Sequence, residues 1–156
     1  SHLPETPADL QVSGLGMNPD ELSSNPRLAE RVVRDLNACA TLPWRDDSFD
    51  CVFNTASIEY LVQPATVLAE VRRVLRPGGV FAVTFSDRWF PPKAIRVWRQ
   101  IHPFERLALV LGLLLQAGFR DLHSETLRGV RRPQDDKYSS QREFSDPLFA
   151  VWGRKP

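Results

Sequence analysis

Residues that build disulfide frameworks and metal centres are scarce in this sequence. Its 156 residues include two cysteines, Cys39 and Cys51, and three histidines, and none of these has the spacing of a paired or metal-binding motif. We therefore expect no metal site, and two unpaired, mostly buried thiols in a reducing compartment.

Long apolar runs and an excess of one charge are also missing. The longest apolar run, residues 107–115, is less than half of the roughly 20 residues that span a bilayer. The first residues lack the basic and apolar regions of a signal peptide, so we expect a cytoplasmic protein with no membrane segment. The formal net charge is +1, from 20 basic and 19 acidic residues, which gives no electrostatic argument for a nucleic-acid partner.

What the sequence does contain is an alternation of strand and helix patterns, in a chain whose length fits one domain. The stretch 128–145 is polar and predicts a solvated loop. Alternation of this kind is typical of α/β proteins with a parallel sheet. Hydrophobic periodicity predicts helices after Asn18, from Pro64 to the Pro77 stop and over 104–116, and strands at residues 12–17, 32–36, 49–56, 80–85, 119–127 and 147–152.

The clearest helix pattern begins at Pro64, which stands where a first helical residue belongs. Apolar residues from Val67 to Leu75 then recur at helical spacing, and the sequence Pro-Gly-Gly at residues 77–79 predicts the end of the helix. A buried strand follows at once, so helix, stop and strand make half of a parallel βαβ unit.

Two motifs in this region carry a resemblance to a known family. Residues 42–52 read LPWRDDSFDCV and residues 70–79 read EVRRVLRPGG. In this order and at this separation they resemble the central half of class I S-adenosylmethionine-dependent methyltransferases. A narrower likeness is to a methyltransferase-like subgroup, whose motifs stand here as GLGMN at residues 14–18, DLN at 35–37 and FSDRWFPPKA at 85–94.

The resemblance implies an α/β fold of the Rossmann-like type, a three-layer α/β/α sandwich. Its mostly parallel sheet has the family order 3-2-1-4-5-7-6, with an antiparallel C-terminal strand. Residues 1–156 are then a single methyltransferase-like domain that is N-terminally incomplete, because nothing before Val12 matches the first strand and its glycine loop.

The strand missing from the match is the middle one of the sheet. Without it, the strands that begin at Val12 and Phe49 would expose backbone groups, at roughly 1 to 3 kcal/mol for each buried group left unsatisfied. We therefore expect the gap to be filled by an upstream segment, a partner chain or rearranged pairing.

The cofactor implied by the resemblance is S-adenosylmethionine, bound at the carboxyl ends of the strands. The position of the acid that binds the ribose hydroxyls is Gly16, which cannot play that role. Met17 can lie against the adenine ring or fill the core, and Asn18 can donate to a ribose oxygen or cap a helix. Asp35 matches the acid that accepts the adenine amino group, with Leu36 as its apolar neighbour.

The remaining site positions follow two later strands. Asn54 and Thr55 match the strand end that faces the reactive methyl group, although such polar residues can also satisfy a strand-to-helix turn. Arg88, Trp89 and Phe90 lie where the family carries substrate contacts. The two aromatic rings could stack on a planar acceptor or only cover the pocket.

The reaction implied is direct displacement at the sulfonium methyl group, accelerated by positioning and by exclusion of water. A general base is needed only if the acceptor must lose a proton. Glu59 and Asp87 are weak candidates for it, and surface carboxylates are the alternative interpretation of both. The acceptor is unknown, with a small molecule favoured and nucleic acid disfavoured.

Two other function classes remain open at this point. A non-catalytic methyltransferase-like binding or assembly module is favoured by Gly16 and by the missing glycine loop. A nicotinamide-dependent oxidoreductase would need a glycine fingerprint followed about 20 residues later by an acid, and the sequence offers neither.

Overall fold

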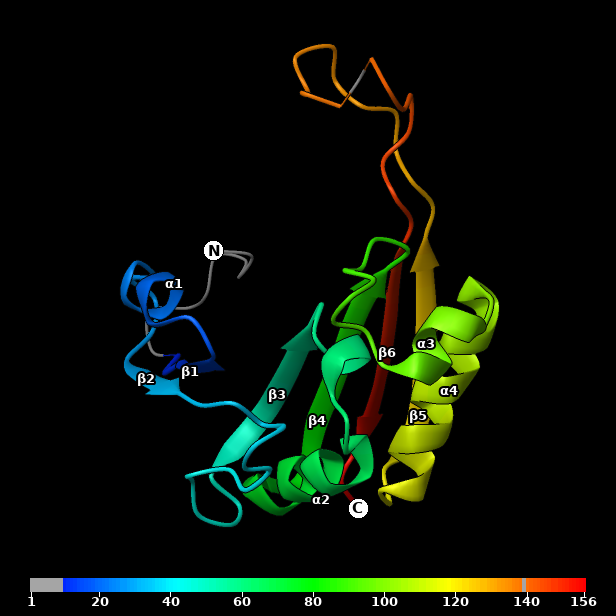
Figure 1. Cartoon of the computed structure of the whole chain (residues 1–156). Helices are drawn as coiled ribbons and strands as arrows, with labels where there is room; N and C mark the ends of the chain where they lie inside the picture. Colours follow the sequence, from blue (N-terminus) through cyan, green and yellow to red (C-terminus); the bar gives the residue numbers. More distant parts are fainter. Residues whose placement is uncertain (1–9, 139) are drawn as a thin grey trace. The chain divides into compact units, whose positions relative to one another are not determined.

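The chain divides into two compact units in the computed structural model, Ser1–Ala40 and Thr41–Pro156. Residues 10–138 and 140–156 are described, and the ribbon in Figure 1 follows them from one end of the chain to the other. That the two units act as a single domain stays a prediction.

The first unit is a parallel βαβ arrangement, as the sequence pattern predicts. The strands pair in parallel, with Gly16 opposite Val33. The predicted cap is confirmed, because the Asn18 side-chain oxygen accepts from the N–H groups of Asp20 and Glu21 at 3.0 and 3.4 Å. The elements are β1 (Ser13–Gly16), α1 (Pro19–Ser23) and β2 (Glu30–Val33).

The second unit is a four-stranded sheet in the order β3-β4-β6-β5. β3 runs parallel to β4, and β6 is antiparallel to both β4 and β5, which confirms the antiparallel C-terminal strand. The elements are β3 (Phe49–Thr55), the 3-10 helix η1 (Ile58–Tyr60), α2 (Pro64–Val74), β4 (Leu75–Ser86), α3 (Arg96–Gln100), α4 (Pro103–Gln116), β5 (Arg120–Leu127) and β6 (Leu148–Arg154).

The two sheets reproduce the two halves of the expected strand order. In family numbering, β2-β1 corresponds to 3-2 and β3-β4-β6-β5 to 4-5-7-6. Within the described residues, β1 pairs only with β2, and β3 only with β4. Rearranged pairing, one of the three expected ways to fill the gap, is therefore not adopted.

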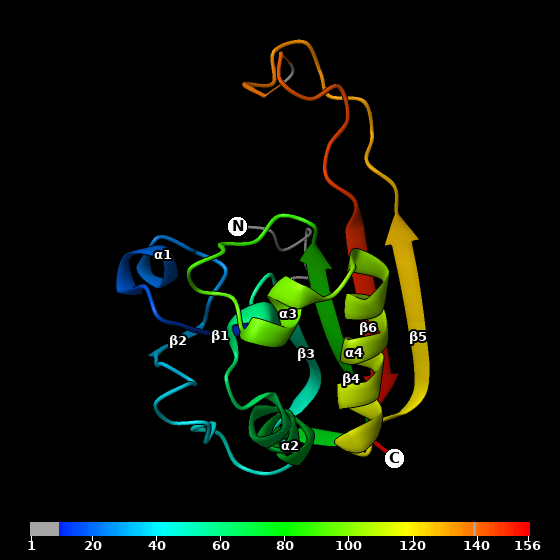
Figure 2. The same ribbon diagram turned by 45° about the vertical axis from the view of Figure 1, so that its right-hand side comes forward.

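Helices cover one face of the four-stranded sheet. Figures 1 and 2 show α2, α3 and α4 on the same side of it. The ring of Phe85 stacks on Phe149 at 5.2 Å between centroids and meets Trp98 edge-on at 5.1 Å. Each such aromatic side chain contributes about 1.5 to 3 kcal/mol through burial. The core under the helices also contains Val67, Leu68, Val71, Val74, Phe81, Val83, Val110, Leu114 and Val151.

The other face of this sheet is bare of helices in the described part of the unit. Phe53 on β3 is 64% exposed, and Leu127 and Leu148 are also exposed. Cys51 shares this face with Phe53 and is exposed, as is Cys39 beyond β2. The cysteines are free as predicted, but the expectation that they are mostly buried is wrong, because the β3 residues on this side have no helix above them.

The Pro-Gly-Gly sequence at residues 77–79 does not itself end α2, contrary to the prediction. α2 ends at Val74 and the chain enters β4 directly at Leu75, so residues 77–79 lie within the strand. Gly78 has a φ of +79°, and a Cβ on Gly79 would lie 2.8 Å from the Arg76 carbonyl oxygen. The glycines therefore allow the irregularity in pairing that β4 shows at its start.

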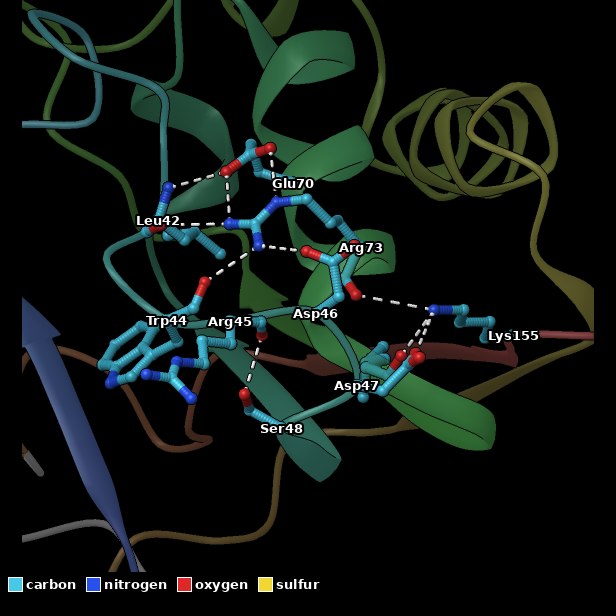
Figure 3. A network of polar contacts seen from close by, with 10 residues as sticks. Leu42, Trp44, Arg45, Asp46, Asp47, Ser48, Glu70, Arg73 and Lys155 are labelled. Atoms are coloured by element: carbon cyan, nitrogen blue, oxygen red, sulfur yellow. Dashed lines mark hydrogen bonds and ion pairs between the residues drawn. The ribbon is translucent and has the colours of Figure 1, made fainter.

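A polar network lies at the end of this sheet where β3 and β4 begin, called here its amino end (Figure 3). From the last turn of α2, Arg73 donates to both oxygens of Glu70 and to Asp46 at 2.8 Å, and to the carbonyls of Leu42 and Trp44 at 3.0 and 2.8 Å. Glu70 also accepts from the Leu42 N–H at 2.9 Å. The hydrogen bonds from Arg73 hold the pKa of Glu70 below its usual range.

Lys155, just after β6, extends this network to the last strand. Its ammonium donates to the Asp47 carboxylate at 2.7 Å and to the Leu75 carbonyl at 2.6 Å. The motif at residues 42–52 is therefore architectural, since its polar residues fasten the segment before β3 to α2 and β6. Among the described residues, no helix could cross a membrane and no three potential metal ligands gather.

Candidate functional site

The carboxyl ends of β3 and β4 lie side by side. Thr55 pairs with Thr84, and the Ala56 N–H donates to the Thr84 carbonyl at 2.8 Å. Ala56 has a φ of +48°, in the left-handed region that residues with a side chain seldom adopt. Such strained residues concentrate at ligand sites, which makes this edge of the sheet the candidate site of the second unit.

Asn54 and Thr55, the last residues of β3, have different surroundings. The Ser57 hydroxyl donates to Asn54 Oδ1 at 3.0 Å, so Asn54 supports the turn, which is the local role considered for it. The Thr55 side chain is exposed. Of the two, Thr55 is therefore the one open to a ligand.

Glu59 follows in η1 and is only 1% exposed. Its interpretation as a surface carboxylate is wrong, because η1 turns it inward and the Ile95 N–H donates to its carbonyl at 2.9 Å. Burial raises the pKa of Glu59, against the opposing effects of a hydrogen bond from Tyr60 and the charge of Arg106. Its Oε2 atom is buried and accepts no hydrogen bond from the described residues.

Arg106, on α4, joins the groups at this end of the sheet. It is 6% exposed, and its Nε donates to the Trp98 carbonyl at 3.1 Å. Its Nη1 lies 3.8 Å from Asp87 Oδ1. Its guanidinium lies 5.3 Å from the ring centroid of Trp89 and 5.5 Å from that of Trp98. Arg106 thus links α3, α4 and the segment that follows β4.

Asp87 lies just beyond β4, with 33% of its side chain exposed. Burial raises its pKa, Arg106 and His102 lower it, and the Asp146 carboxylate raises it further. Asp87 is therefore a half-buried carboxyl group that keeps access to solvent, whereas Glu59 has none.

The three residues predicted to contact the substrate have separate surroundings. Arg88 pairs with Asp146 at 3.4 Å, and its guanidinium lies 4.9 Å from the Tyr138 ring centroid. Trp89 lies against Arg106. Phe90 is 66% exposed and donates its N–H to the Tyr60 hydroxyl oxygen at 3.0 Å. The charge of Arg88 is therefore already engaged. The ring of Phe90 is largely exposed, with Lys93 Nζ 5.9 Å and the Tyr60 ring 6.5 Å from its centroid.

In the first unit, three predicted cofactor residues follow one another at the end of β1. Met17 is 67% exposed, so its interpretation as core filling is wrong. Asn18 uses its oxygen in the helix cap, which leaves its amide N–H groups as donors. Among the described residues, the nearest neighbour of a Cβ on Gly16 would be the Leu22 side chain, at 3.7 Å or more, so packing does not require a glycine there.

Asp35 and Leu36 lie beyond β2, which ends at Val33 rather than at residue 36 as predicted. The strand stops early because Asp35 starts a turn. One of its carboxylate oxygens accepts from the Asn37 N–H at 2.8 Å, and its carbonyl accepts from the Cys39 N–H at 3.0 Å. Asp35 and Leu36 are both half-buried. An acceptor oxygen beside an apolar side chain fits the amino group and ring of an adenine.

Sequence reasoning missed the residues that connect the candidates, namely Arg106, Trp98 and Tyr60. A signal for Arg106 was present, since it stands four and eight residues before Val110 and Leu114 and so shares their buried face. No comparable pattern marks Trp98, because α3 has only five residues.

Comparison with known proteins supplies the family. A family model described as "Methyltransferase domain" matches residues 3–83. A probable phthiotriol/phenolphthiotriol dimycocerosates methyltransferase of Mycobacterium ulcerans is 38% identical over 89 residues, covering 57% of this chain and 31% of the relative. An uncharacterized methyltransferase of Mycolicibacterium gilvum is 30% identical over 148 residues, covering 94% of this chain and 50% of the relative. The chain thus spans half or less of the length of these relatives.

Among solved structures, the [4+2]-cyclase SpnF is similar in fold. It superimposes with a TM-score of 0.62 at 18% identity, covering 94% of this chain and 67% of that one. At that identity the likeness concerns the fold alone, which is Rossmann-like α/β as predicted.

Proposed function

The chain belongs to the class I S-adenosylmethionine-dependent methyltransferase family, and on that premise we propose that it transfers a methyl group to an acceptor by direct displacement. Membership makes S-adenosylmethionine the cofactor. The observation that carries the proposal is the strained carboxyl end of β3, where Thr55 and Ala56 lie beside the end of β4. Open α/β sheets bind their ligands at such ends.

The roles proposed for the first unit follow from the groups that remain free there. Asp35 accepts the adenine amino group with the oxygen that its turn does not use, and Leu36 and Met17 contact the ring. Asn18 donates to the ribose through its amide. Gly16 leaves the ribose without the carboxylate that the family places at this position.

The roles proposed for the second unit concern the methyl group and the acceptor. Thr55, with Asn54 beside it, faces the reactive methyl group, and Trp89 and Phe90 offer aromatic contacts to the acceptor. Arg88 contributes only if an acceptor group displaces Asp146 from it.

A general base, where the acceptor needs one, is Asp87. The pKa of both carboxyl groups is raised, but only Asp87 reaches solvent, whereas Glu59 is fully enclosed. A base whose pKa is closer to the working pH transfers protons more effectively.

The acceptor proposed is a small molecule, because the net charge of +1 offers nothing to a nucleic acid. We further propose that an upstream segment or a partner chain pairs with the edges of β1 and β3 along which no described strand lies. A cytoplasmic location also stays a prediction.

The test is calorimetric titration of S-adenosylhomocysteine into the full-length protein and its variants. Asp35→Asn keeps the acceptor for the Asn37 N–H but replaces the free oxygen by a donor, so affinity should fall about tenfold. Asp20→Asn removes a charge from the same unit and should leave affinity unchanged. Equal affinities for the two variants would remove Asp35 from the site.

Gly16→Asp provides a gain-of-function test in the same titration. Because a side chain fits at Gly16, the restored carboxylate should raise the affinity for S-adenosylhomocysteine about tenfold. Gly14→Asp is the matched control, since a Cβ there would lie 2.5 Å from Leu28 Cδ1 and should only destabilise the unit.

A non-catalytic binding module is the second candidate function, and the glycine at residue 16 favours it. Failure of the parent protein and of Gly16→Asp to bind S-adenosylhomocysteine would support this candidate and contradict methyl transfer.

A further inference from the structure

Arg106 is the one charge on the buried face of α4, a helix whose residues are all described. It shares that face with Val110 and Leu114. An arginine stays ionised in proteins, and burying its charge costs several kcal/mol unless partners compensate. A hydrophobic residue would pack there without that cost, so the charge itself has a role.

The groups around Arg106 come from three other segments, namely α3, η1 and the residues after β4. Its only hydrogen bond to another described residue goes to the Trp98 carbonyl. Asp87 and Trp89 are held by an ion pair at 3.8 Å and a cation–π contact at 5.3 Å. Three buried side-chain atoms near it make no hydrogen bond within the described chain: Glu59 Oε2, Asp87 Oδ1 and Trp98 Nε1. Arg106 therefore orders its neighbours through charge and ring contact.

We propose that Arg106 is a positioning residue for the acceptor side of the site, holding the Asp87 carboxylate and the Trp89 indole at the carboxyl end of β4. The inference rests on the proposed function, because it is Asp87 and Trp89 that are assigned to the acceptor. A cation–π contact of this kind favours the orientation in which the indole face lies against the guanidinium.

The charges that act on Asp87 define how this arrangement responds to pH. Arg106 and His102 favour its ionised form, and Asp146 disfavours it while pairing with Arg88. Because burial leaves the pKa of Asp87 above its usual range, acid releases the ion pair at a higher pH than for an ordinary aspartate. The charge of Arg106 also favours the ionised form of Glu59, which lies in η1.

The test is acrylamide quenching of tryptophan fluorescence in full-length protein carrying Trp44→Phe and Trp152→Phe. The two remaining tryptophans in the chain are then Trp89 and Trp98, and the contribution of Trp89 is obtained by comparison with Trp89→Phe. Arg106→Met should raise the quenching constant of Trp89 about twofold, because the indole loses its cation. Arg106→Lys should restore most of the protection.

Arg99→Met is the matched control, since Arg99 is exposed on the neighbouring helix α3. It should leave the quenching of Trp89 unchanged. A quenching constant in Arg106→Met equal to that of the parent would overturn the proposal, as would failure of the lysine variant to restore protection.

Should Arg106→Met fail to fold, Asp87→Asn tests the same link. In the parent, quenching of Trp89 should change with pH in the acid range, and this change should be absent from Asp87→Asn. Persistence of the change in that variant would also overturn the proposal. Binding of S-adenosylhomocysteine, measured on the same samples, reports separately on the proposed function, because the quenching experiment needs no cofactor.

Discussion

Arg73 on α2 and Arg106 on α4 lie at opposite ends of the same four-stranded sheet. Arg73 pairs with Glu70 and Asp46, and Arg106 pairs with Asp87 and acts through its charge on Glu59. Arg73, with 29% of its side chain exposed, makes five hydrogen bonds, and the pKa of its partner Glu70 is lowered. Arg106, with 7% of its side chain exposed, makes one hydrogen bond to a carbonyl. The pKa values of Glu59 and Asp87 near it are raised.

The difference separates a stabilising end of the sheet from a functional one. At the amino end, Glu70 gains more from the hydrogen bonds of Arg73 than it loses through burial, so the network fastens the fold. At the carboxyl end, burial raises the pKa of both carboxyl groups. Left-handed backbone occurs at both ends, at Asp47 and at Ala56, but an alanine adopts it less readily than an aspartate. Proteins retain such unfavourable features mainly where binding or chemistry needs them.

The largest effect on stability is expected from Arg73→Met. It removes the donor of five hydrogen bonds, to Glu70, Asp46 and two carbonyls, so the free energy of unfolding should fall by about 2 to 3 kcal/mol in urea titrations. Arg76→Met is the control. Its ion pair with Asp50 is at least half exposed and should be worth less than about 1 kcal/mol. Equal losses of stability in Arg73→Met and Arg76→Met would contradict the proposal that the Arg73 network stabilises the amino end of the sheet.

A smaller change in the free energy of unfolding is expected from Glu70→Gln at the amino end of the sheet and from Glu59→Gln at its carboxyl end, with opposite signs. Glu70 stabilises the fold above its ordinary pKa of about 4.3 and loses that contribution as the pH falls through its lowered pKa. Glu59 has a raised pKa, so its contribution is complete below the ordinary value and is lost as the pH rises.

At pH 7, Glu70→Gln should therefore lower the free energy of unfolding by about 1 kcal/mol, and Glu59→Gln should raise it by a similar amount. The Glu59 difference should shrink as the pH falls from 7 to 4, whereas the Glu70 difference should persist at pH 4 and shrink only as the pH falls further, through the lowered pKa of Glu70. Urea titrations at the two pH values provide the measurement, and changes of the same sign at pH 7 would contradict the comparison.

Local pattern was enough to predict the elements whose signal lies in neighbouring residues. Pro64 begins α2, and Asn18 caps α1, as the capping and periodicity rules require. The resemblance supplied the strand order, which periodicity alone does not specify. The early end of β2 was missed because Asp35 bonds to its own turn, a competition that hydrophobic pattern does not register.

The candidate site was predicted only as separate positions at the ends of strands. Burial of Glu59 and exposure of Cys51 depend on which face the helices cover, which is a tertiary property. The role of Arg106 depends on contacts with residues 8 to 47 positions away in the sequence, Trp98 and Glu59 among them. Such contacts leave no periodic trace in a single sequence.

The central claim is that the carboxyl ends of the strands bind the cofactor while the amino end of the four-stranded sheet serves the fold. Amide NMR of the full-length protein during titration with S-adenosylhomocysteine tests it most directly. The largest shifts are expected at Met17, Thr55 and Ala56, with Glu70 and Arg73 unchanged. Shifts concentrated around Arg73, or none at the strand ends at saturation, would contradict it.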